Sequence, residues 1–203
     1  MRSGLGAEDA VRAACDLVAG GLAVDLELRG SDVGRRLADL SRRLEAAGIA
    51  SACETTVPVA RFVPAMDAGP ALALDGPAAE VDRVAAVLPS ARVVVDASEP
   101  GAEDRCRVLA GRRVRLVGGR GRAASLSFVR CLTILMSGDG EPAVATTDPR
   151  LIAVTGERAA WNGRPPESWE HVMPWGPPTE EQRRLLAAGS TVRVRVPVSG
   201  VRA

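Results

Sequence analysis

Lysine and tyrosine are both absent from this chain of 203 residues, whose 26 basic side chains are all arginine. Catalysis by a lysine Schiff base or a lysine general base is therefore excluded for these 203 residues, because arginine stays protonated and cannot take either role. Aromatic residues make up only 2% of the sequence, whereas hydrophobic residues make up 46%. The core must therefore be filled by Val, Leu, Ala and Ile side chains.

Histidine, paired cysteines and long apolar runs are scarce or missing as well. His171 is the only histidine, which excludes a histidine-rich zinc site. No apolar run reaches about 18 residues, and acidic residues in the first predicted helix argue against a signal peptide. A net charge of +1 does not indicate binding to nucleic acid or membrane. The cysteines show no CxxC spacing, and we interpret them as small buried residues of a soluble, cytoplasmic protein in a reducing compartment: Cys15, Cys53, Cys106 and Cys131.

Eight short runs of apolar and β-branched residues alternate with segments of helical periodicity. This alternation predicts a single α/β domain over residues 1–203, a compact (β/α)8 TIM barrel whose active site lies where the strands end. The sequence runs only five residues past the last strand, so we expect the helix after strand eight to be missing. The predicted strands are 22–28, 49–53, 71–75, 91–96, 113–117, 143–147, 169–173 and 192–198. The predicted helices are 7–18, 33–47, 77–88, 102–110, 124–136, 149–160 and 179–188.

The second half of the chain resembles bacterial proline dehydrogenase. The matching segments are Arg115-Leu-Val-Gly-Gly119, residues 127–136, 144–151 and 166–176, and the runs 182–185 and 192–197. The first half matches more weakly, through residues 22–28 and 71–75. The resemblance implies a distorted (β/α)8 barrel that uses FAD to oxidise L-proline to pyrroline-5-carboxylate.

The departures from the family pattern lie in its functional motifs. Gly118 stands where the family has the lysine of an RLVKGAY-like motif, and Thr147 stands at the histidine of a THDPR motif. Glu170 survives from an EFQMLYG motif, but Trp175 replaces its tyrosine. The paired arginines that clamp the proline carboxylate lie on the helix expected to be missing, and losing a bidentate clamp costs several kcal/mol of binding and positioning.

The resemblance also implies the site residues. It assigns substrate chemistry to Asp75, Glu170 and Trp175, with no metal. It assigns flavin binding to Arg115, Gly119, Arg120, Thr146 and Asp96.

The residues themselves allow other interpretations. The glycine-rich run 118–122 either cradles a phosphate or is a solvated loop. Carboxylates at predicted strand ends either hold a divalent cation and do acid–base work or have structural roles: Glu27, Glu54, Asp75, Asp96, Asp148 and Glu170. In the structural alternative, Asp148 caps a helix, Asp75 and Asp96 end strands before turns, and Glu170 pairs with Arg115.

His171 follows Glu170 on a strand and therefore points to the opposite face, toward a helix or solvent. The three tryptophans are predicted to pack in the interior, with Trp175 alternatively lying against a ligand ring.

Three functions follow from these observations. The first is a catalytically degenerate homologue of proline dehydrogenase that acts as a binding or regulatory protein. The second is an active flavoenzyme, with FAD, that oxidises proline or a related amino acid in a remodelled site. The third is a different barrel activity that uses an acidic mouth and a metal. We also expect the apolar faces of strands eight and one to be covered by helix 7–18, by a second copy or by a protein partner.

Overall fold

The eight strands form a closed parallel barrel in the order β1 to β8, alternating with helices, as the sequence predicts. The computed structural model describes residues 4–61, 71–118 and 121–199. The strands are β1 (Ala23–Leu28), β2 (Cys53–Pro58), β3 (Ala71–Asp75), β4 (Arg92–Asp96), β5 (Arg113–Val117), β6 (Glu141–Ala145), β7 (Glu170–Pro174) and β8 (Val192–Val198). The helices are α1 (Ala7–Ala19), α2 (Val33–Ala46), α3 (Ala78–Val87), α4 (Ala102–Leu109), α5 (Arg122–Ser137), α6 (Pro149–Trp161) and α7 (Glu180–Ala187), with 3-10 turns at Ala50–Ala52, Val59–Arg61 and Pro166–Ser168.

The chain forms two compact units. The first contains Met1–Ala91, Pro174–Gly176 and Arg193–Ala203. Its sheet carries β1, β2, β3 and most of β8, and β1 pairs in parallel with both β2 and β8. In β8 the valines are buried and the residues between them are half-exposed, because alternate side chains of a strand point to opposite faces. The same alternation gives this sheet one aliphatic face and one polar face.

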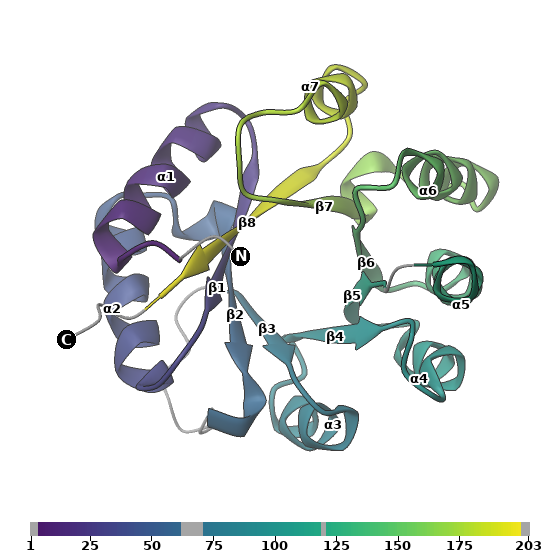
Figure 1. Ribbon diagram of the computed structural model, residues 1–203, viewed down its shortest axis with the longest axis horizontal. Helices are drawn as coiled ribbons and strands as arrows, with labels where there is room; N and C mark the ends of the chain where they lie inside the picture. The colour runs from purple at the N-terminus through teal and green to yellow at the C-terminus, as the bar shows by residue number, and fades with distance from the viewer. Residues whose placement is uncertain (1–3, 62–70, 119–120, 200–203) are drawn as a thin grey trace. The chain divides into compact units, whose positions relative to one another are not determined.

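The second unit contains Arg92–Met173 and Pro177–Val192. Its sheet runs through β4, β5, β6 and β7 by parallel pairing. Helices α4, α5 and α6 stand side by side along one face of these strands (Figure 1). The face toward these helices is aliphatic, and its strand residues are buried: Val93, Val95, Val114, Leu116 and Val144. The opposite face carries the arginines and carboxylates of these strands.

The segment before α1 pairs with the end of β8, within the first unit. Leu5 forms a parallel bridge with Val198; its N–H donates to the Pro197 carbonyl at 2.9 Å, and its own carbonyl accepts from the Ser199 N–H at 2.9 Å. A Cβ at Gly4 would lie 2.7 Å from the Ser199 backbone nitrogen, so this close approach requires glycine. Helix α1 itself packs on α2 and β1. Helix α1 thus covers part of β1, as expected from the sequence for that strand, and Leu5 pairs with the end of β8.

Several predicted boundaries are wrong in a way that affects the site. Strand β2 begins at Cys53, because the residues from Ala50 to Ala52 form a 3-10 turn instead of extending the strand. Glu54 is therefore the second residue of β2 and does not stand at its carboxyl end. Glu170 is the first residue of β7, at its amino end.

Trp161 is 85% exposed at the end of α6, so the prediction that it packs in the interior is also wrong. Among the described residues, no helix is long and apolar enough to span a membrane.

Candidate functional site

A pocket of about 410 Å³ opens at the carboxyl ends of β1, β2 and β3, in the first unit. Strand register brings its walls together, because Glu27 pairs with Thr56 and Pro58 pairs with Asp75. The carboxyl ends of the strands are where barrels of this architecture place their ligands. The lining residues are Glu27, Leu28, Arg29, Gly30, Thr56, Pro58, Arg61 and Asp75.

The pocket carries charges of both signs. Arg29 forms an ion pair with Glu27 at 2.8 Å, and this pair makes one wall. Arg61 and Asp75 are exposed at the pocket, and among the described residues neither takes part in an ion pair. Asp75, which the sequence predicts to be a site residue, thus lines the same pocket as an arginine. Such a pocket offers a carboxylate to a positively charged ligand group and a guanidinium to a negatively charged one.

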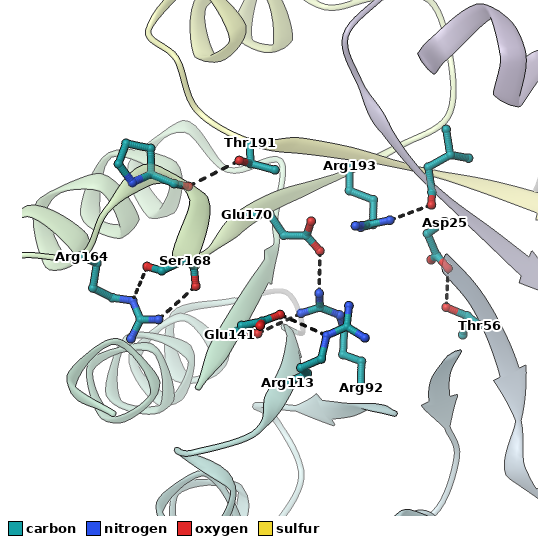
Figure 2. Close-up of polar contacts among 12 residues, drawn as sticks. Asp25, Thr56, Arg92, Arg113, Glu141, Arg164, Ser168, Glu170, Thr191 and Arg193 are labelled. Atoms are coloured by element: carbon teal, nitrogen blue, oxygen red, sulfur yellow. Dashed lines mark hydrogen bonds and ion pairs between the residues drawn. The ribbon is translucent and has the colours of Figure 1, made fainter. Parts of the chain in front are cut away.

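Buried polar groups lie below the pocket on the same face of the sheet. Thr56 donates a hydrogen bond from Oγ1 to Oδ1 of the buried Asp25 at 2.6 Å (Figure 2). Asp25 is in register with Glu54 on one side and with Arg195 on the other. A buried carboxylate is stable only when it is paired or hydrogen-bonded. The hydrogen bond with Asp25 therefore fixes the orientation of the Thr56 side chain at the pocket.

Two glycines and an arginine shape the rim. Gly76, directly after β3, has φ +145, and a Cβ there would lie 2.6 Å from Cγ2 of Val59; Gly30, directly after Arg29, has φ +96. Arg36 of α2 donates to the carbonyls of Arg29 and Val198, the latter at 2.9 Å, and so ties the ends of β1 and β8 to the helix. Burial lowers the pKa of Arg36 from its usual value, although its guanidinium remains charged.

Glu170 belongs to a different group of charges, in the second unit. Its Oε1 lies 3.0 Å from Nη2 of Arg92, and both side chains are buried. Arg92 also donates to the Glu141 carbonyl at 2.9 Å, and the Glu141 carboxylate pairs with Arg113 at 3.1 Å (Figure 2). All four residues occupy the first position of their strands. Glu170 thus lies at the amino ends of the strands and not in the predicted ring of carboxylates at their carboxyl ends.

Arg115 is fully buried in the middle of β5. It is in register with Ala143, which is itself in register with Glu170. The structure gives Glu170 the partner Arg92, which sequence reasoning missed; the pair predicted between Glu170 and Arg115 stays a prediction.

A side chain at Gly118, which the resemblance places at the lysine of the family motif, would meet a neighbouring ring. A Cβ at this position would lie 2.5 Å from Cδ2 and 3.2 Å from Cε2 of Phe128, far closer than carbon atoms approach without strain. The Phe128 ring is 1% exposed and packs in the buried face of α5. The space at the start of a side chain on residue 118 is therefore already filled by an aromatic ring.

The described residues assigned to flavin have local roles. Asp96 ends β4, and its Oδ1 accepts from the Ser98 N–H at 2.8 Å and the Ser98 hydroxyl at 2.6 Å. Thr146 accepts from the Asp148 N–H at 3.1 Å, and Asp148 caps α6 by accepting from the Arg150 N–H at 2.9 Å. Both structural roles, for Asp96 and for Asp148, match the alternative interpretation of the sequence.

Of the five residues assigned to flavin, the three described ones are buried or engaged in turns. Arg115 is enclosed within the sheet, Asp96 and Thr146 hold turns, and the ring of Phe128 fills the place of the missing lysine. Gly119 and Arg120 lie outside the described residues. Trp175 is half-buried, and its backbone N–H donates to the Arg195 carbonyl at 3.0 Å.

His171 lies on the helix side of β7, as predicted from the alternation with Glu170. It is 2% exposed, and the Trp169 ring lies edge-on at 4.8 Å from it. Burial lowers the pKa of His171 to about 4; the nearby Glu181 opposes this shift, and Arg184 adds to it. Its Nδ1 is buried without a hydrogen-bond partner among the described residues. A neutral imidazole enclosed under α7 is a packing residue.

A metal site at an acidic mouth finds no support in the described parts of the chain. Nowhere in residues 4–61, 71–118 and 121–199 do three His, Cys, Asp or Glu side chains gather in a way that could hold an ion. Glu54 and Glu170 lie away from the carboxyl ends of their strands, and Asp96 and Asp148 serve a turn and a cap.

Two solved structures resemble this chain over 97% of its length. Proline utilization A from Bdellovibrio bacteriovorus, inactivated by N-propargylglycine, superposes with a TM-score of 0.80 at 14% sequence identity. Proline utilization A from Corynebacterium freiburgense superposes with a TM-score of 0.69 at 16% identity. The fold is a proline dehydrogenase-like barrel.

This proline dehydrogenase-like barrel spans 30% and 29% of the length of those two chains. No family model matches the sequence, and no curated protein matches it. At these identities the likeness concerns the fold, and the chemistry has to be argued from the side chains.

Sequence reasoning missed the buried charges Asp25 and Arg92. The signal is present in the alternation of β1, where Asp25 and Glu27 interrupt the aliphatic residues, and in Arg92 at the start of β4. The sequence alone shows only that these residues belong to the alternating pattern of a strand. The strand register is needed to show that their side chains meet partners.

Proposed function

We propose that this proline dehydrogenase-like barrel binds a small zwitterionic amino acid, of the size of proline, without oxidising it. The observation that carries the proposal is the pocket at β1, β2 and β3, in which Asp75 and Arg61 present opposite charges in about 410 Å³. A zwitterion needs one anionic and one cationic partner, and a ligand of this size fits in such a volume.

Each charge has a role in this proposal. The Asp75 carboxylate receives the ammonium of the ligand, and the Arg61 guanidinium receives its carboxylate. Glu27 and Arg29 neutralise each other at 2.8 Å and form a rigid polar wall. Leu28 and Pro58 supply the apolar surface against which a pyrrolidine ring packs.

The proposal that the protein does not oxidise its ligand rests on residues of the second unit. Gly118 replaces the lysine of the motif, and the buried Phe128 ring fills the space that a side chain there would enter. Asp96 and Thr146 are engaged in local turns. A protein with these substitutions lacks the contacts by which the family would hold a flavin, so we propose a binding or regulatory homologue acting in the cytoplasm. Its four cysteines, all unbridged, fit that reducing compartment.

Two measurements on the purified protein test the two halves of this proposal. The first is the visible spectrum, followed by titration with FAD. A colourless protein without saturable FAD binding is expected; a yellow protein that reduces a dye when given L-proline would establish the flavoenzyme instead.

The second measurement is calorimetric titration with three ligands. L-proline is compared with pyrrolidine, which lacks the carboxylate, and with tetrahydro-2-furoic acid, which lacks the amine. L-proline should bind at least roughly tenfold more tightly than either analogue, since each lost charge-assisted hydrogen bond costs about 1.5–3 kcal/mol. Equal binding of all three ligands, or none, would reject the zwitterion site.

A matched pair of variants locates the site. Asp75→Asn should weaken L-proline binding by roughly tenfold or more. Asp16→Asn removes an exposed carboxylate of α1 that lies outside the pocket lining, and it should leave binding unchanged. If both variants bind L-proline like the parent protein, Asp75 does not hold the ligand.

A further inference from the structure

Helices α4 and α5 each bury one cysteine at the surface where the two helices pack. Cys106 of α4 and Cys131 of α5 are both free thiols and 0% exposed, and each shifts the pKa of the other across the contact between the two helices. The two helices lie next to each other in the second unit (Figure 1). A disulfide between two such thiols forms when their side chains bring the sulfurs to about 2.05 Å.

A second contact fixes the helices at this level. Glu103, one turn before Cys106 on α4, forms an ion pair with Arg130 of α5 at 3.3 Å, and Arg130 directly precedes Cys131. Ser127, one turn before Cys131, donates from its hydroxyl to the Ala97 carbonyl. These contacts hold α4 and α5 in place around the two cysteines.

The two thiols are electrostatically unlike. The neighbouring Cys106 lowers the pKa of Cys131 below the ordinary value of a thiol; burial and Glu103 oppose this shift, and Ser127 and Arg107 add to it. The neighbouring Cys131 and burial raise the pKa of Cys106. A thiol of lowered pKa beside a thiol of raised pKa is the arrangement of an attacking sulfur and a resolving sulfur.

We propose that Cys106 and Cys131 are an oxidisable dithiol that closes to a disulfide between α4 and α5 when the protein meets a peroxide. The Cys131 thiolate attacks one peroxide oxygen, the O–O bond breaks, and hydroxide leaves to give a sulfenic acid. The Cys106 sulfur then attacks the sulfenic sulfur and loses its proton, and the second oxygen leaves as water. The sum is two thiols and one hydrogen peroxide to one disulfide and two waters.

Burial sets the rate of this reaction. Both sulfurs are covered, so peroxide reaches them when the short helix α4 opens locally. The pair therefore reacts more slowly than an exposed low-pKa thiol, but the disulfide, once formed, is shielded from bulky reductants.

The other two cysteines provide an internal comparison. Burial raises the pKa of Cys53 to about 11, and the influence of Cys15 on it is electrostatic and smaller. Cys53 therefore supplies little thiolate at neutral pH. Oxidation should accordingly select the pair on α4 and α5, even though Cys15 is the more exposed sulfur.

The purified protein, oxidised with hydrogen peroxide and mapped by non-reducing peptide mass spectrometry, tests the proposal. The expected product is monomeric and lighter by about 2 Da, the loss of two hydrogens. Its linked peptides contain Cys106 and Cys131, and dithiothreitol restores the starting mass. A bridge from Cys15 to Cys53 with the other two thiols intact would overturn the proposal. So would sulfinic acid at Cys131 without a bridge, or disulfides between two copies.

Two variants keep the test independent of folding defects. Cys15→Ser with Cys53→Ser leaves only the proposed pair and should still lose about 2 Da and gain roughly 5 °C or more in Tm on oxidation, as expected for a cross-link that restrains the unfolded chain. Cys131→Ser should lose both effects. If the Cys131→Ser protein oxidises with the same mass change, the assignment of the pair is wrong.

Discussion

Protonation of His171 is expected to destabilise the fold as the pH falls from 6.5 toward 4. The imidazole is 2% exposed, its Nδ1 has no hydrogen-bond partner among the described residues, and Trp169 lies edge-on against it. Burial lowers its pKa from 6.5 to about 4, the opposing attraction from Glu181 being the smaller effect. The folded protein therefore resists taking up a proton that the unfolded chain accepts readily.

The sign and size follow from linkage. Above pH 6.5 His171 is neutral in both states, so its contribution to stability is fully present. Between pH 6.5 and about 4 the unfolded chain binds more protons, so the free energy of unfolding decreases as the pH falls. A shift of about 2.5 units at 1.36 kcal/mol per unit gives a total loss of about 3 kcal/mol near pH 4 and below. For a domain of about 200 residues this corresponds to roughly 6–12 °C in Tm.

Because this histidine is the only one in the sequence, the measurement is direct. The Cε1–H resonance, followed by NMR between about pH 3.5 and 8, should titrate near pH 4. Urea denaturation over the same range should give a decrease in unfolding free energy that is larger than in a His171→Gln variant, whose side chain takes up no proton. The difference between the two proteins isolates the histidine from the carboxylates that titrate below about pH 5.

An ordinary midpoint near pH 6.5 in the folded protein would refute the burial argument, whatever the stability data show. If the midpoint is depressed but the two proteins lose stability in parallel, the linkage would be wrong in size, and the unfolded state would have to protect the imidazole as well.

Three further changes test the internal contacts by urea denaturation. Glu170→Gln weakens the buried pair with Arg92 and should cost roughly 3 kcal/mol; a loss below about 1 kcal/mol, typical of surface pairs, would mean that the pair is solvated. Arg164→Met removes hydrogen bonds to the carbonyls of Gly138, Gly140 and Ser168 and should cost at least roughly 3 kcal/mol, since a hydrogen bond to a charged group contributes about 1.5–3 kcal/mol; no change would mean that water replaces them. Gly140→Ala places a Cβ 2.6 Å from the Arg112 backbone nitrogen and should destabilise the protein, whereas Gly156→Ala meets nothing within 4 Å in helix α6. The second alanine should stabilise the protein by about 0.5–1 kcal/mol. Equal effects of the two alanines would contradict the packing around residue 140.

The repeating pattern of the chain makes the fold predictable. Strands β3 and β5 have the predicted bounds, and so does β8, because each is a short apolar run between clear turn signals. Strand β2 is predicted too early because Ile49 and Ala50 look like strand residues, and nothing local reveals the 3-10 turn. Element types follow from local periodicity, whereas boundaries also depend on tertiary packing.

The candidate site is less predictable, for a physical reason. Asp75 follows an apolar strand, which predicts a site residue, and it does line the pocket. The same kind of pattern predicts Glu170, but this residue stands at the opposite end of its strand, paired with Arg92. The alternation along a strand indicates which face of the sheet a side chain takes. An error of a few residues in the predicted boundary, however, moves a residue from one end of the strand to the other.

The contact between Gly118 and Phe128 also limits how this sequence can change over evolutionary time. A lysine introduced first would drive its Cβ to 2.5 Å from the Phe128 ring. A smaller residue introduced first at position 128 would leave a core cavity that costs about 3–5 kcal/mol. Each single step carries a cost in stability, so a lysine at position 118 is accommodated at the lowest cost when both positions change together.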